Sequence, residues 1–377
     1  MNQELGLRIL GQIMDWTDDQ AREEFRWLRL MARLKYDGYR DFQAGMRFFE
    51  SLATWLQQFK QDDRTTAYSF VRSLLVYVGP GEMQHLVEQF FPRVVHERLL
   101  GTVAESLDIP DYLVLANLDA LAAVDRLRRQ TLFLGLSDGA RIDIVRHANV
   151  GLLTNEQLVV ATQLDKDKWT DLLDNLRTDL NDPLAQFRLV YLIDDFAGTG
   201  TSLLRFNAGK DKWSGKLMRF KESLEAAATQ LQDSIVAPDW ELCIHHYIAT
   251  TRAAAAIRKQ VADPSPAVAG WAKDVHVSFG TVLPSDLPLN AVARRHEAFR
   301  ALTRAYYDPA LRTRHTDVGG AKHLGLGYGG CALPLVLDHN TPNNAVALLW
   351  AETSGGSLNG TAAPEMRPLF RRRQRHA

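Results

Sequence analysis

One stretch of the chain, residues 186–204 (QFRLVYLIDDFAGTGTSLL), constrains the fold more than any other. Residues 188–193 form a nearly continuous apolar run of strand length, which predicts a strand buried on both faces. Two carboxylates, Asp194 and Asp195, stand at its carboxyl end. They are followed by a glycine- and hydroxyl-rich turn and an expected helix from Leu203. The order strand, turn, helix predicts an α/β fold, in which ligands bind outside the carboxyl ends of the strands.

The turn after the two aspartates is suited to an anion. Gly198 and Gly200 let the main chain approach a ligand closely, so that the backbone amides of the turn can point at one spot. A helix that starts near Thr201 would add its positive end. The predicted phosphate-binding residues are Ala197, Gly198, Thr199, Gly200, Thr201 and Ser202.

The acid pair complements this turn. Asp194 and Asp195 can accept hydrogen bonds from vicinal hydroxyls, or hold a divalent cation beside a phosphate. A 5-phosphoribosyl group, with a phosphate at one end and a diol in its middle, has the matching shape. No lysine follows the second glycine, so the turn is not a P-loop. The alternative is an ordinary strand-to-helix turn that carries two aspartates.

At residues 190–202 (VYLIDDFAGTGTS) the chain resembles the type I phosphoribosyltransferases. In that family the acid pair binds the ribose hydroxyls and the loop binds the 5′-phosphate. The resemblance implies a catalytic and metal-binding role, with Mg²⁺, for Asp194 and Asp195. It also implies that phosphoribosyl pyrophosphate or a nucleotide is the ligand, and that the reaction is transfer or N-glycosidic cleavage at ribose C1. We therefore expect a phosphoribosyltransferase-like, Rossmann-type parallel sheet.

Three further polar turns are candidates for the same site. An apolar strand at residues 131–136 ends in SDGAR, and in the resembled family a loop in this place holds pyrophosphate; a plain turn with a surface arginine is the alternative. The other two turns are candidates for contacts to a base, although turn formation alone also explains them. The residues concerned are Ser137, Asp138, Gly139 and Arg141 for pyrophosphate, and Thr251, Arg252, Asn343 and Asn344 for the base.

The order of these patterns predicts three regions. Residues 1–128 are expected to be helical, and their aromatic stripes are interpreted as helix packing. Residues 129–352 are expected to form the phosphoribosyltransferase-like α/β domain, with His245 and His246 in structural roles inside a strand. Residues 353–377 form a basic tail, which either binds nucleic acid or an acidic partner, or is a solvated end.

Composition excludes several classes of protein. The chain has 377 residues, of which 46% are apolar and 24% charged, enough for a sizeable core. A net charge of −1 gives the whole molecule no attraction for nucleic acid or membrane surfaces. Two cysteines form neither a disulfide framework nor a zinc site, which favours a reducing, cytoplasmic compartment. No apolar run approaches the length of a membrane span.

The long helical N-terminal region suggests a narrower resemblance. Residues 35–39 (KYDGY), the acid-pair motif and residues 339–350 resemble the phosphoribosyltransferase-like domains of bacterial conflict systems, including retron-associated ones. This resemblance implies an effector in anti-phage defence that works with partner proteins and a nucleic acid. Two alternatives are a non-catalytic nucleotide sensor and a structural subunit of a defence nucleoprotein complex.

Overall fold

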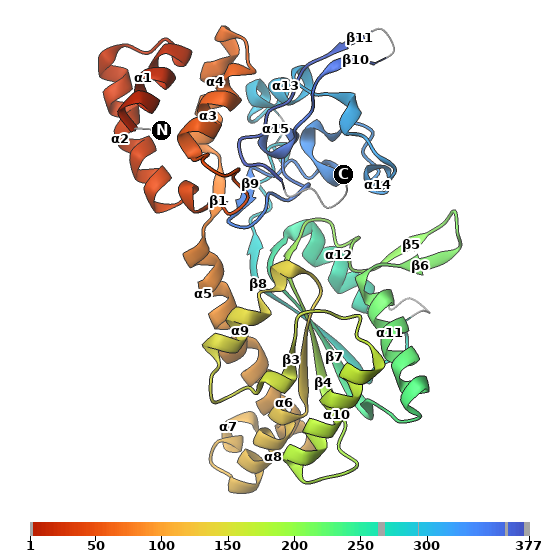
Figure 1. Ribbon diagram of the computed structural model, residues 1–377. Helices are drawn as coiled ribbons and strands as arrows, with labels where there is room; N and C mark the ends of the chain where they lie inside the picture. The colour runs from red at the N-terminus through yellow and green to blue at the C-terminus, as the bar shows by residue number, and fades with distance from the viewer. Residues whose placement is uncertain (1–2, 263–267, 293, 359–360, 373–377) are drawn as a thin grey trace. The chain divides into compact units, whose positions relative to one another are not determined.

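The computed structural model describes residues 3–262, 268–292, 294–358 and 361–372 (Figure 1). The chain divides into two compact units, Met1–Met83 with Pro284–Ala377, and Gln84–Leu283. These borders differ from the expected ones at residues 128 and 352, because the N-terminal helices and the C-terminal segments form one unit together. No helix among the described residues is long and apolar enough to cross a membrane.

Contacts between distant parts of the sequence build the first unit. Strand β1 pairs in parallel with β9, more than 250 residues later in the chain. Phe70 stacks on Phe299 with ring centroids 3.9 Å apart, and Tyr36 packs on Phe370 at 5.8 Å. The elements are α1 (Gln3–Met14), α2 (Asp18–Leu34), α3 (Phe48–Gln57), α4 (Gln61–Ser73), β1 (Val76–Val78), α13 (Glu297–Ala305), α14 (Arg314–Asp317), β9 (Leu335–Leu337), α15 (Ala347–Trp350), β10 (Gly356–Leu358) and β11 (Thr361–Ala363).

The core of this unit settles two interpretations. The aromatic side chains of the N-terminal helices pack inside it, since Phe48 and Trp55 are fully buried. The basic tail is not a solvated end over its described part, because Leu369 and Phe370 are also fully buried. Within that part, Arg371 forms an ion pair with Glu352 at 2.8 Å. The remaining tail arginines beyond residue 372 lie outside the described residues.

The second unit contains a five-stranded sheet, counted over the described residues, in the order β3-β2-β4-β7-β8. All neighbouring strands are parallel, which confirms the predicted α/β class. Helix α5 joins the first unit to the second. The elements are α5 (Pro80–Phe90), α6 (His96–Leu107), α7 (Asp111–Val114), α8 (Leu118–Arg129), β2 (Thr131–Gly135), α9 (Ile142–Ala148), β3 (Leu158–Val159), α10 (Lys166–Leu180), β4 (Phe187–Ala197), β5 (Arg205–Asn207), β6 (Lys212–Ser214), α11 (Lys216–Leu231), β7 (Val236–Thr250), α12 (Thr251–Ala262) and β8 (Asp274–Leu283).

Both faces of the central strand β4 are covered, as its uniform apolarity predicts. Leu192 faces a cluster that includes Trp169 of α10 and Phe220 of α11. On the opposite face, Tyr191 packs against Phe90 of α5 with ring centroids 5.4 Å apart. The alternation of side chains along the strand therefore places successive residues in two different layers.

The strand order sets the place of a site. The chain forms β2 first, adds β3 on one side of it, and then crosses to form β4 on the other side. The connections leaving β2 and β4 run in opposite directions, so the carboxyl ends of these two strands form the switch point at which ligands bind in open α/β sheets. The predicted pyrophosphate loop follows β2, and the acid pair lies near the end of β4.

The observed elements differ from the expected ones around the acid pair. Strand β4 continues through both aspartates to Ala197, and the helix expected at Leu203 is replaced by the β5–β6 hairpin, so that α11 begins only at Lys216 (Figure 1). In the first unit, residues Ala347–Trp350 form the short helix α15. The strand before it, β9, pairs with β1 and is not part of the five-stranded sheet.

Candidate functional site

The acid pair is divided between the two faces of the sheet. Asp194 and Asp195 both lie within β4, so their side chains point in opposite directions. Asp194 is only 2% exposed. Its Oδ1 accepts a hydrogen bond from the Ser137 hydroxyl at 2.5 Å, and its Oδ2 forms an ion pair with the Lys216 ammonium. A carboxylate so deeply buried requires such partners, because burying an unpaired charge is strongly unfavourable.

Lys216 is the site residue that the sequence did not reveal. It is the first residue of α11, and the β5–β6 hairpin returns the chain so that its amide donates to the Ser202 carbonyl at 3.0 Å. Gly215, just before it, has φ +134°, and a Cβ there would lie 2.3 Å from the Leu203 carbonyl oxygen. Only glycine fits this crossing, which positions the lysine beside Asp194. A glycine before a helical run was the only available signal.

The loop after β2 lies directly against Asp195. A Cβ on Gly139 would fall 2.3 Å from Asp195 Oδ2 and 2.5 Å from its Cγ. The Gly139 amide donates to Ser137 Oγ at 3.3 Å, and the Phe196 amide donates to Asp195 Oδ1 at 2.8 Å. The structure therefore brings the predicted pyrophosphate loop and the predicted acid pair together.

Strand β7 also holds this loop in place through a hydrogen bond. The Tyr247 hydroxyl donates to the Ala140 carbonyl at 3.0 Å. Burial raises the pKa of Tyr247 far above its usual value, so the phenol stays protonated and keeps donating. The next residue, Arg141, is buried and has φ +51°. Asp138 is exposed at the tip of the loop.

The Gly/Thr loop after β4 packs on α12. Gly200 has φ +78°, and a Cβ on it would meet Ile257 Cγ1 at 3.2 Å. The Thr250 hydroxyl donates to the Gly198 carbonyl at 2.7 Å. Thr199 and Thr201 share a hydrogen bond of 2.8 Å between their hydroxyls. Because no helix starts at Thr201, the expected positive helix end is missing from the turn itself.

The exposure of the loop residues differs along the turn. Ala197, Gly198, Thr199 and Gly200 are buried, Thr201 is half-buried, and Ser202 is exposed. A phosphate could therefore approach the loop from the side of its last two residues.

The remaining candidates divide between the two units. Thr251 and Arg252 begin α12 at the carboxyl end of β7, and the Thr251 hydroxyl donates to the Leu283 carbonyl at 2.8 Å. Both side chains are exposed at the carboxyl end of the parallel strands, the end at which the acid pair lies. Asn343 and Asn344 instead belong to the first unit, on the turn after β9. There the Asn344 amide donates to the Tyr328 carbonyl at 3.1 Å, a structural contact.

The arrangement offers little for a metal held by the protein alone. Both oxygens of Asp194 already contact Ser137 and Lys216. Over the described ranges, no group of three or more His, Cys, Asp or Glu side chains is placed to bind a metal ion. Because Mg²⁺ usually needs only one or two protein carboxylates beside water and substrate oxygens, the role of Asp194 and Asp195 with Mg²⁺ stays a prediction.

The two strand histidines are buried as expected for structural residues. His245 is fully buried, its Nδ1 lies 2.8 Å from the Ser278 hydroxyl, and its ring packs on Phe90 at 4.5 Å. Burial lowers the pKa of His245 to about 3 and also lowers the pKa of His246. Both imidazoles are therefore neutral in the folded protein at neutral pH.

These histidines make stability depend on pH. Because the pKa of His245 is about 3 in the folded protein and ordinarily 6.5, the unfolded chain binds more protons between these values. The free energy of unfolding should thus fall as pH drops from about 6.5, by on the order of 1 kcal/mol per pH unit for this histidine. Urea unfolding at pH 5 and pH 7 measures the slope. His245→Gln should flatten it, whereas His147→Gln, at an exposed position, should not. An unchanged slope in His245→Gln would contradict this account.

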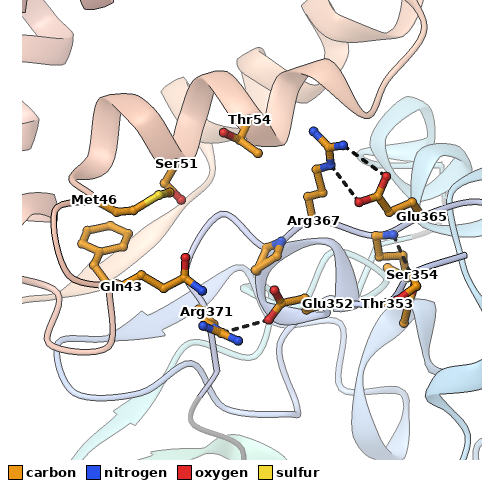
Figure 2. A pocket seen from close by; sticks show the side chains of 13 residues that line it. Gln43, Met46, Ser51, Thr54, Glu352, Thr353, Ser354, Glu365, Arg367 and Arg371 are labelled. Carbon is orange, nitrogen blue, oxygen red and sulfur yellow. Dashed lines mark hydrogen bonds and ion pairs between the residues drawn. The ribbon is translucent and has the colours of Figure 1, made fainter. Parts of the chain in front are cut away.

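A cavity of about 700 Å³ lies within the first unit (Figure 2). Its two arginines are neutralised by glutamates, with Arg367 and Glu365 3.1 Å apart and Arg371 and Glu352 2.8 Å apart. Among the described residues, none that was predicted for the phosphoribosyl site lines it. Since its charges are paired, this cavity is not a candidate for the phosphate-bearing ligand.

Comparison with known proteins supports the assignment of the fold. A family model described as PRTase-CE matches residues 52–372. The match includes the whole five-stranded sheet, both loops around the acid pair and Lys216. No curated protein and no solved structure matches the chain. The chain belongs to the PRTase-CE family, and the switch point between β2 and β4 is part of a phosphoribosyltransferase-like domain.

Proposed function

We propose that this protein binds phosphoribosyl pyrophosphate or a nucleotide at the switch point between β2 and β4. The observation that carries the proposal is the convergence of two loops on one acid pair. The Ser137 hydroxyl donates a hydrogen bond to Asp194. Gly139 has no side chain, and the space that a Cβ would need there is filled by the side chain of Asp195. A plain turn with two aspartates, the structural alternative, would not need a second loop fitted to both carboxylates.

Each part of the site has a role in this proposal. Asp195, which is half-buried, accepts hydrogen bonds from the ribose hydroxyls. The Gly/Thr loop at residues 197–202 holds the 5′-phosphate, and the loop at residues 137–141 holds the diphosphate. Lys216 holds the buried Asp194 in place through their ion pair. Thr251 and Arg252 are exposed at the same sheet edge and are available to a base or a second phosphate.

The proposed chemistry is substitution at ribose C1. The bond between C1 and the diphosphate oxygen breaks, and its electron pair leaves with the diphosphate. A nitrogen of a base, or water, forms the new bond to C1 and releases its proton to solvent or to the departing diphosphate. The transition state carries positive charge at the ribose, which the carboxylates of Asp194 and Asp195 stabilise electrostatically. Any Mg²⁺ would be bound largely through the diphosphate oxygens, which is the usual arrangement for this ion.

The biological setting is a second part of the proposal. We propose a role in bacterial anti-phage defence, together with partner proteins and a nucleic acid, on the basis of the resemblance of residues 35–39 and 339–350. Phage plating on bacteria that express the wild-type chain or an acid-pair variant, with and without neighbouring genes, tests this role. Equal plating in all cases would remove it.

A nucleotide sensor remains the second candidate, and one contact favours it. The Lys216 ammonium already occupies Asp194 in the described structure. A ligand that approaches Asp194 must displace or share this ion pair, and Lys216 begins a 16-residue helix that can transmit the change. Binding without turnover would support the sensor over the enzyme.

We expect calorimetric titration to show binding of phosphoribosyl pyrophosphate to the wild type in the presence of Mg²⁺. Asp194→Asn/Asp195→Asn should weaken it by at least tenfold, because the charge-assisted hydrogen bonds from the ribose hydroxyls to Asp195 are lost, each contributing about 1.5–3 kcal/mol. Asp171→Asn/Asp174→Asn, at two exposed positions of α10 outside the predicted site, removes the same charge without touching the pair and serves as the control for net charge.

The same titration without Mg²⁺ shows whether the ligand needs the ion. Chromatography of the reaction mixture then separates enzyme from sensor, because released diphosphate appears only with turnover. No binding by a well-folded wild type, or equal binding by the aspartate variant, would refute the site assignment.

A further inference from the structure

A second charged pocket, of about 320 Å³, lies beside the β5–β6 hairpin. The hairpin and the first turn of α11 form its walls. Among the described residues, it shares no lining residue with the predicted phosphoribosyl site. The residues on which the inference rests are Arg205, Asn207, Lys210, Lys212, Trp213 and Arg219.

Positive charge is concentrated in this segment. Residues 205–222 contain six lysines or arginines and two acidic residues, although the whole chain has a net charge of −1. One carboxylate, Glu222, lines the pocket and lies 3.5 Å from the Lys212 ammonium. Lys210 and Arg219 are exposed, and among the described residues neither has a carboxylate partner. Like charges that line one small pocket repel one another, and a bound anion would relieve the repulsion.

The other walls suit a base. Trp213 is half-buried and packs against Phe206 with ring centroids 5.3 Å apart, which fixes its ring at the pocket. The Ser214 hydroxyl is shielded from solvent and has no hydrogen-bond partner among the described residues. The side-chain amide of Asn207 can both donate and accept hydrogen bonds at the pocket wall. A volume near 300 Å³ is at the small end of ligand sites and excludes large cofactors.

We propose that this pocket binds a nucleoside monophosphate, at a site separate from the one proposed between β2 and β4. The phosphate lies among Lys210, Lys212 and Arg219, and the base stacks on Trp213. A nucleotide fits better than inorganic phosphate because an aromatic ring and an unpartnered hydroxyl lie beside the cations.

The pocket is joined to the first site through the backbone. The Arg205 guanidinium, which lines the pocket, donates to the Thr201 carbonyl in the Gly/Thr loop at 3.2 Å. Gly215, also a lining residue, precedes Lys216 and hence the ion pair with Asp194. A nucleotide in the pocket therefore contacts both segments that position the first site, and its binding would alter affinity there.

The test titrates AMP, GMP, CMP and UMP separately into the Asp194→Asn/Asp195→Asn variant, so that the first site does not contribute. At least one nucleotide should bind with one-to-one stoichiometry, and its unphosphorylated nucleoside should bind at least tenfold more weakly. Lys210→Ala/Arg219→Ala in this background should weaken the nucleotide at least tenfold. Both positions are exposed, so the fold should be retained, which circular dichroism and thermal melting check.

Lys166→Ala/Lys259→Ala is the matched control, because it removes two exposed cations from the same unit but leaves the pocket intact. This control should bind the nucleotide as tightly as the Asp194→Asn/Asp195→Asn variant from which it is made. The proposal is overturned if no nucleotide binds, if binding survives Lys210→Ala/Arg219→Ala, or if the control weakens it equally. Because the assay uses the acid-pair variant, these outcomes are independent of phosphoribosyl pyrophosphate binding.

Discussion

Replacing Lys216 with methionine should lower the free energy of unfolding by about 3 kcal/mol, the largest stability effect that we expect from a single charge. The side chain of Asp194 is 3% exposed, and the Lys216 ammonium is its ion-pair partner. Without the lysine, the carboxylate stays buried with the Ser137 hydroxyl as its only side-chain hydrogen-bond donor among the described residues. Methionine keeps most of the volume, so the loss reports the charge and not a cavity. Chemical denaturation at pH 7 measures it.

A double-mutant cycle makes this prediction specific. Asp194→Asn in the Lys216→Met chain should recover most of the loss, because a neutral amide no longer needs a cation. Lys212→Met is the control: its ammonium lies 3.5 Å from Glu222, but both side chains are more than half exposed, so the effect should stay below about 1 kcal/mol. If Lys216→Met and Lys212→Met cost the same, the buried pair does not hold the site together.

Gly139→Ala should weaken binding of phosphoribosyl pyrophosphate by at least tenfold while the protein remains folded. The added Cβ would lie 2.3 Å from Asp195 Oδ2 and 3.0 Å from Asp195 Cβ, so the whole side chain must move. A displacement of about an ångström is enough to cost a large part of a positioned contact. The overpacking itself should destabilise the fold by about 1–3 kcal/mol. Calorimetric titration and thermal melting measure the two effects separately.

The matched control is Gly101→Ala in α6 of the same unit, where an added Cβ meets nothing within 4 Å. It should leave ligand affinity unchanged and raise stability by about 1 kcal/mol, since alanine is the better helix former. Wild-type affinity in Gly139→Ala would show that Asp195 does not contact the ligand, and would leave Asp194 alone to account for the acid-pair motif.

The inserted hairpin gives the site its unusual feature. In the expected arrangement a helix would follow the Gly/Thr loop at once and point its positive end at the ligand. Here β5 and β6 intervene, and the delayed helix α11 supplies a lysine instead. The full positive charge of the Lys216 ammonium, which lies beside Asp194, therefore takes the place of the partial positive charge that a helix N-terminus would have placed at the loop. The same insertion forms the pocket proposed for a nucleotide.

Local patterns in the sequence determined the parts of the fold that depend on neighbours along the chain. The apolar run at residues 188–193 specified a strand buried on both faces, and the acid pair with its glycine turn predicted a ligand site at the carboxyl end of that strand. The loop at residues 137–141 was also correctly placed at that edge, because parallel strands bring their carboxyl ends together.

Only the tertiary structure decided the contacts between residues far apart in the chain. The pairing of β1 with β9 joins N-terminal and C-terminal segments into one unit, and two short apolar strands carry no record of their partner. Lys216 reaches Asp194 because a hairpin reverses the chain between them, whereas in the sequence it is an ordinary lysine at the start of a helix. Periodicity encodes which face of an element is buried; the identity of the covering element depends on packing, which no local pattern contains.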